Sequence, residues 1–113
     1  MTTFFGFAMS DTMFAGDCEI SRRQITADEA RELIAEGITS CCNPSHAATI
    51  ATLGPRFGIT VPIPETPPRV VLAPGDRIIV MSVRGLPRMT DRHEYTAEEV
   101  ASATFVFSIY TVR

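Results

Sequence analysis

The 113-residue sequence lacks several features that mark large classes of proteins. It has no lysine, so all ten of its basic residues are arginines, and thirteen acidic residues leave a formal net charge of −3. That charge argues against broad, non-specific binding to long DNA or RNA, which needs a net basic face. It permits a small anionic ligand, because a few arginines can each hold a phosphate in a bidentate fork.

Cysteine is scarce, and long apolar runs are absent. The three cysteines, Cys18, Cys41 and Cys42, are odd in number and two are adjacent, which argues against a disulfide framework. A reduced, cytoplasmic setting is therefore expected. No stretch approaches 18 apolar residues, so we expect no membrane span. The apolar start of the chain follows no basic segment, which is not typical of a signal peptide.

The common cofactor and catalytic motifs are absent as well. There is no Walker phosphate loop, GxGxxG, HExxH or nucleophile elbow. Cys41, Cys42 and His46 are close in sequence, but adjacent cysteines on a strand point to opposite faces and no Cys-x-x-Cys is present. We therefore expect neither a metal nor an organic cofactor, and we interpret the thiols as buried packing groups.

The segments that are present predict a sheet. The turn sequence at 73–76 is expected to join strands at 69–72 and 77–84. Residues 10–17 should form a turn or short helix, and the proline-rich segment 60–68 an extended surface strip. Runs rich in β-branched and aromatic residues predict further strands at 3–9, 18–24, 38–42 and 104–112.

Three helices are expected between these strands. Two begin at capping boxes and should span 27–36 and about 97–103. The third should have Asn43 as its N-cap and Pro44 in its first position, and it should stop at Gly54-Pro55.

The alternation predicts the class α/β: a single domain over 1–113 with a mixed sheet of about five strands and flanking helices. A core this small favours pairing as a symmetric homodimer.

His46 is the first candidate for chemistry, because it falls in the first turn of the third helix, just after a strand. Free backbone N–H groups and the positive end of the helix dipole gather there and favour a phosphate. A histidine beside a phosphate can act as a general acid, since the anion raises its pKa while the helix end lowers it. The alternative is a histidine that only packs at the start of the helix.

Arginines form the second candidate. Arg22 and Arg23 are a weaker basic pair, whose side chains should point to opposite faces of a strand and be plain surface. Arg84 ends a strand, and the loop at 85–95 could clamp phosphates, or it could be a solvated loop whose arginines Asp91 and Glu94 neutralise. The basic side chains of that loop are Arg88, Arg92 and His93.

Taken in order, these segments resemble the viral ring nucleases, small anti-CRISPR proteins that cleave cyclic tetra-adenylate. FFGFAMS, which ends at Ser10, resembles the strand and serine that open that family. The family's capped helix is resembled by ITADEARELIAEG, and its serine-bearing strand by ITSCC. Its histidine-x-small-threonine motif is resembled by His46-Ala-Ala-Thr49. Arg69 resembles the arginine of the family's Asn-Arg motif. The segment VVLAPGDRIIVMSVR that follows resembles the family's unit of strand, Pro-Gly-Asp turn and strand, which ends in an arginine, here Arg84.

The resemblance covers nearly the whole chain, with departures. Ser45 stands where the family usually has glycine. After Arg84 the family tends to have Leu-Pro-Glu-Gly, whereas here the run is Gly85-Leu-Pro-Arg88, within a longer loop. Glu94 is a substitute for the family's glutamate only if an insertion is allowed.

The resemblance implies a homodimer that binds a cyclic oligoadenylate across its two-fold axis and cuts it without metal into linear di-adenylates with 2′,3′-cyclic phosphate ends. This would silence type III CRISPR defence. His46 would protonate the leaving 5′-oxygen and Arg84 would hold the phosphate charge. A binding protein that sequesters the ring without cutting it, and a structural phage protein that keeps only the fold, stay open as alternatives. The ligand contacts would come from Ser10, Ser45, Thr49, Arg69, Arg88, Arg92, His93 and Glu94.

Overall fold

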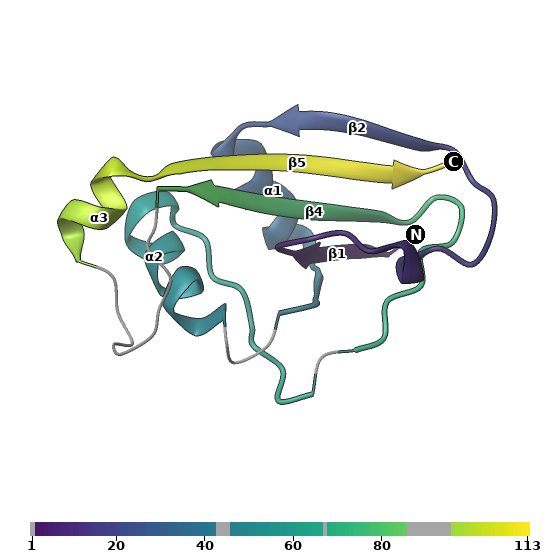
Figure 1. The fold of residues 1–113 in the computed structure, drawn as a ribbon, viewed down its shortest axis with the longest axis horizontal. Helices are drawn as coiled ribbons and strands as arrows, with labels where there is room; N and C mark the ends of the chain where they lie inside the picture. The colour runs from purple at the N-terminus through teal and green to yellow at the C-terminus, as the bar shows by residue number, and fades with distance from the viewer. Residues whose placement is uncertain (1, 43–45, 67, 86–95) are drawn as a thin grey trace.

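The computed structural model describes residues 2–42, 46–66, 68–85 and 96–113. Strands and helices alternate along the chain (Figure 1). In order, the elements are β1 (Thr3–Gly6), the 3-10 helix η1 (Asp11–Met13), β2 (Ile20–Ile25), α1 (Ala27–Glu36), β3 (Thr39–Ser40), α2 (Ala47–Phe57), β4 (Arg77–Arg84), α3 (Ala97–Ser102) and β5 (Thr104–Val112).

The five strands form one mixed sheet in the order β2-β5-β4-β1-β3. β1 is parallel to both of its neighbours, β3 and β4, whereas β5 is antiparallel to β4 and β2. The predicted α/β class and five-stranded mixed sheet are confirmed.

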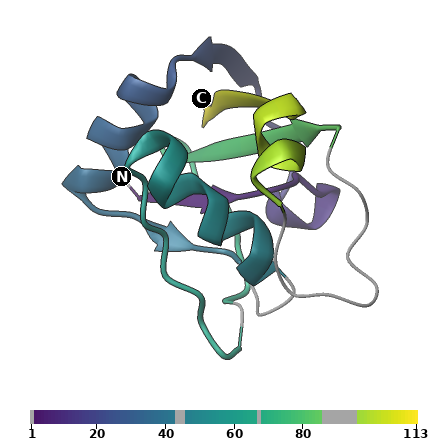
Figure 2. The ribbon, with the colours of Figure 1, turned by 90° about the vertical axis from the view of Figure 1, so that its left-hand side faces the viewer.

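One face of the sheet is covered by α1 and α2, and we call it the helix face (Figure 2). Strand residues alternate between faces, so Phe5, Ile79 and Phe107 share this one and lie in the main core. Ala30 of α1 and Leu53 of α2, both fully buried, close that core from above.

The other face is covered only in part, by η1 and the chain around Val70 and Leu72, and we call it the loop face (Figure 2). Ile78, Val80 and Val112 are buried in this second, smaller core. Toward the carboxyl end of β4 the cover ends, and the strand side chains of this face are exposed there.

The predicted strand at 69–72 is wrong. Leu72 makes only an isolated bridge with Phe14, its N–H donating to the Met13 carbonyl at 2.7 Å. The turn at 73–76 does form, with the Asp76 N–H donating to the Ala73 carbonyl at 2.9 Å. It leads into β4 without forming a hairpin, because β5 and β1 already occupy both edges of β4.

The predicted end of the third helix is also wrong. The structure describes α2 from Ala47, with His46 as its N-cap, and the predicted cap Asn43 and first residue Pro44 lie outside the described residues. It continues through Pro55 to Phe57 and ends at Gly58, whose φ is +69°. Proline crowds the Cβ of the residue before it, and here that residue is Gly54, which has no Cβ.

The other elements follow the prediction closely. α1 spans the predicted residues, and both capping boxes are present. β1 and β3 are shorter than expected, and β2 is an edge strand displaced by one or two residues from the prediction.

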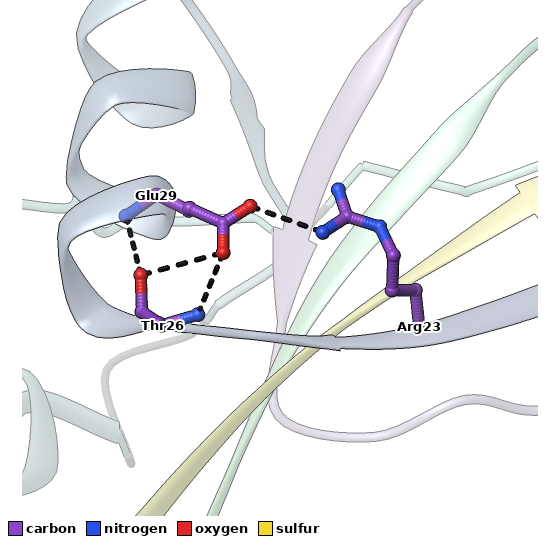
Figure 3. Close-up of polar contacts among 3 residues, drawn as sticks. All are labelled: Arg23, Thr26 and Glu29. Carbon is purple, nitrogen blue, oxygen red and sulfur yellow. Dashed lines mark hydrogen bonds and ion pairs between the residues drawn. The ribbon is translucent and has the colours of Figure 1, made fainter.

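The capping box of α1 joins that helix to β2 (Figure 3). The Thr26 hydroxyl accepts from the Glu29 N–H at 3.1 Å, and the Glu29 carboxylate accepts from the Thr26 N–H at 3.3 Å. Arg23, on β2, donates to the same carboxylate at 3.0 Å. These hydrogen bonds lower the pKa of Glu29 below its usual value, and the bond from Arg23 has the largest effect.

We expect Thr26→Ala to lower the free energy of unfolding by about 1 kcal/mol, because it leaves an N–H at the start of the helix without its acceptor. Urea denaturation measures this. Thr60→Ala, at an exposed threonine outside any helix or strand, is the control and should change stability by less than about 0.5 kcal/mol. Equal losses in the two variants would contradict a role for the cap.

Candidate active site

The three parallel strands β1, β3 and β4 run toward the same edge of the sheet, and β4 extends furthest; β1 and β4 are labelled in Figure 1. The chain beyond β1 passes through Phe7, the chain beyond β3 reaches the start of α2, and β4 ends at Arg84. Loops at the carboxyl ends of strands commonly carry binding and catalytic groups on a rigid support.

His46 lies at this edge as the N-cap residue of α2, three positions earlier in the helix than predicted, since the sequence placed it inside the first turn. Its backbone is helical (φ −90°, ψ −1°) and its side chain does not cap the helix. The imidazole packs on the Phe7 ring, with 4.7 Å between centroids, and Phe7 in turn meets Phe5 edge-on at 5.8 Å. This row of rings fixes His46 to the main core.

The burial of His46 lowers its pKa below the usual value of 6.5. Desolvation disfavours the charged imidazolium, so His46 is mainly neutral at pH 7 in the free protein. A bound anion would act in the opposite direction and favour the protonated form.

Arg84 is exposed at the end of β4, opposite Thr104 of β5. Its side chain belongs to the loop face, since it follows Val80 and Ser82 in the strand alternation. Gly6 pairs with Val80, so Arg84 lies four residues, or about 13 Å, beyond the end of β1. His46 belongs to the helix face, and the two predicted catalytic residues therefore lie on opposite faces of one sheet edge.

The structure places the remaining predicted site residues in different parts of the molecule. Thr49 lies on α2 within one turn of His46. Ser10 caps η1, its hydroxyl accepting from the Thr12 N–H at 3.2 Å, and η1 contacts the chain near the amino end of β4. Arg69 is exposed, beside Val70 on the loop-face side. Ser45, Arg88, Arg92, His93 and Glu94 lie outside the described residues.

Sequence reasoning missed a groove of about 500 Å³ between α2 and α3. At its rim, Arg56 lies over the Phe57 and Phe105 rings at 5.5 and 5.2 Å and donates to the Val100 carbonyl at 3.4 Å. A signal for it was present in the small side chains spaced along α2. The lining residues are Ala48, Ala51, Thr52, Pro55, Arg56, Ala97, Val100 and Ala101.

The cysteines divide as strand alternation predicts. Cys42 is buried in the main core and Cys41 packs against the smaller one. Burial raises the pKa of Cys42, and it raises that of Cys41 to about 11, so neither thiol is an activated nucleophile at neutral pH. In the part of the chain that the structure describes, no three histidine, cysteine or acidic side chains are grouped to hold a metal ion.

Comparison with known proteins gives a match among solved structures. No protein-family model matches the chain, and no curated protein sequence does. The fold is similar to that of B116 of Sulfolobus turreted icosahedral virus, with a TM-score of 0.71. The match covers 98% of this chain and 99% of that one at 13% sequence identity, which shows a shared fold. Among the described helices, none is long and apolar enough to cross a membrane.

The lowered pKa of His46 gives a testable prediction. An NMR titration should place it below 6.5, and Phe7→Ala should move it back toward 6.5 by exposing the ring. Because the unfolded chain binds this proton more readily, the stability linked to His46 is complete above pH 6.5 and declines as the pH falls toward the folded pKa.

His46→Ala identifies which of the two histidine signals belongs to His46. A His46 that titrates at or above 6.5 in the free protein would contradict its burial against Phe7.

Proposed function

We propose that the protein is a metal-independent ring nuclease that acts as a symmetric homodimer. Its substrate is a cyclic oligoadenylate, the tetra-adenylate ring by resemblance, and its products are linear di-adenylates with 2′,3′-cyclic phosphate ends. Acting in the host cytoplasm, it would remove the messenger of type III CRISPR defence. The shared fold with a virus-encoded protein supports this setting.

The observation that supports this function best is the position of His46. It stands at the start of the eleven-residue α2, where the positive end of the helix dipole favours an anion. Ala47 and Ala48 follow it, and such small side chains leave room for a phosphate to approach the backbone. The imidazole is held on Phe7 beside this helix end.

The chemistry requires only one proton transfer from the protein. The ribose 2′-oxygen attacks the adjacent phosphorus, forming the P–O2′ bond while the P–O5′ bond breaks. The 2′-hydroxyl proton passes to solvent, and the protonated His46 gives its proton to the departing 5′-oxygen. His46 is mainly neutral when the site is empty, so the phosphate that binds beside it supplies the charge that favours protonation.

Arg84 contributes charge to this reaction. It is exposed at the carboxyl edge of the sheet, where its guanidinium can hold a phosphate of the ring. Within one subunit His46 and Arg84 belong to different faces, so a ring held between two subunits can contact His46 of one and Arg84 of the other.

Sequestration without cleavage is the second candidate, and the neutral state of His46 favours it. An imidazole that stays neutral can accept or donate hydrogen bonds to a ligand but cannot act as the general acid.

We expect the wild-type protein to cleave labelled cyclic tetra-adenylate in EDTA. His46→Ala should reduce the rate by roughly 10²–10⁴-fold with binding retained, because a general acid lowers the barrier without supplying most of the binding energy. Arg84→Ala should weaken binding and turnover together, since it removes a charged hydrogen bond. Product analysis and equilibrium binding measure the two effects.

Arg113→Ala, at an exposed arginine beyond the end of β5, is the control and should behave as wild type. Cleavage by His46→Ala at the wild-type rate would show that His46 is structural. Retention of the ring without products by the wild type would favour sequestration, and neither binding nor products would favour a structural role.

The 85–95 loop gives a further prediction. We propose that it lies over the bound ring and contacts it through Arg88, Arg92, His93 or Glu94. The triple variant with Arg88, Arg92 and His93 changed to alanine should bind the ring more weakly, with a smaller dependence on salt. An affinity and salt dependence equal to wild type would exclude the loop from the site.

A further inference from the structure

Arg22 and Arg23 are adjacent on β2, but the sheet sends their side chains to opposite faces. Arg23 pairs with Ile109 and forms the ion pair with Glu29 on the helix side (Figure 3). Arg22 pairs with Tyr110 and belongs to the loop face. Neither arginine has a part in the proposed mechanism.

Arg22 is held in place on the loop face. Its guanidinium donates to the Ser108 hydroxyl at 2.9 Å and lies 6.0 Å from the centre of the Tyr110 ring. A guanidinium has five N–H donors, so this bond leaves others for a ligand. The side chain is exposed although Ser108 beneath it is buried.

The register places Arg22 and Arg84 on the same face. Along β5, their partners Tyr110 and Thr104 are six residues apart, a distance of about 20 Å. The exposed residues between them are polar, with Gln24 on β2 and Ser82 on β4. Because one phosphate cannot touch both arginines, a ligand spanning them must carry at least two.

The charge on the uncovered part of this face comes from arginine. The described strands carry no acidic side chain on either face of the sheet, and Asp11 belongs to η1, which covers another part of the loop face. An exposed strip with an arginine toward each end, and no strand carboxylate between them, complements an anion. It disfavours direct contact with a second copy of the same face, since like charges would meet.

We infer that the uncovered part of the loop face is a binding surface for a short oligonucleotide, and that Arg22 is a phosphate-binding residue at the end opposite Arg84. Tyr110, half-buried beneath Arg22, helps to hold the guanidinium on this face. Two arginines suit a short ligand with few phosphates, not a long nucleic acid. This deepens the proposed function and rests on it for the identity of the ligand, cyclic tetra-adenylate.

The test compares Arg22→Ala with Arg23→Ala, the neighbouring arginine on the other face. Binding of cyclic tetra-adenylate and of a linear tetra-adenylate is measured in EDTA at two salt concentrations, in the His46→Ala background so that cleavage is slow compared with the measurement. Arg22→Ala should weaken binding about tenfold or more. It should also reduce the slope of log affinity against log salt by about 1. Arg23→Ala should stay within about twofold of its parent, since Arg23 lies on the helix side.

Arg22→Gln guards against misfolding, because glutamine keeps a polar side chain with N–H donors on the edge strand while it removes the charge and the guanidinium. It should bind as weakly as Arg22→Ala while melting near the parent temperature. Equal affinities for the Arg22 and Arg23 variants, or no binding of either probe to the parent, would overturn this inference.

Cleavage by wild type distinguishes this inference from the proposed function. Binding that depends on Arg22, without any cleavage, would contradict the proposed nuclease activity and support the binding surface. Cleavage that is unaffected by Arg22→Ala would support the nuclease activity and contradict the binding surface.

Discussion

The antiparallel pairing of β4 with β5 is the contact on which the rest of the structure depends. Eight residue pairs run from Arg77 with Thr111 to Arg84 with Thr104, and this register decides which side chains share a face. The pairing puts Ile79, Met81 and Phe107 under the helices and leaves the opposite set to be covered by loops. Because β5 also pairs along β2, and β4 along β1, the two faces extend across the whole sheet.

The sequence predicted most accurately those features that depend on neighbours in the chain. α1 was predicted to the residue because its capping box and Gly37 are local signals. The strand predicted at 69–72 failed because strand formation needs a free neighbour, and the register leaves none beside β4. The end of α2 was misjudged because Gly54 relieves the crowding that Pro55 would otherwise cause.

In the candidate site, too, the sequence predicted the local features and not those that depend on how the strands pair. A local pattern placed His46 at the start of α2, but three positions too far into the helix. No local pattern could show that His46 and Arg84 belong to different faces, because that depends on where β1 ends relative to β4. Strand alternation predicted that Arg22 and Arg23 would diverge. Which of them meets a carboxylate was settled by the position of α1, whose Glu29 reaches Arg23.

The arginines of this lysine-free chain therefore divide by what lies near them. Arg23 and Arg31 form ion pairs around α1, and Arg77 donates to Thr3 at 2.9 Å at the start of the sheet. The exposed pairs of Arg23 and Arg31 add little to stability, but each neutralises an arginine, and Arg77 has Glu36 at 4.0 Å in the same way. Arg22 and Arg84 are exposed on a sheet face whose strands carry no acidic side chain in the described residues. A negative net charge is thus compatible with two exposed arginines on one sheet face, because the described strands carry no carboxylate beside them.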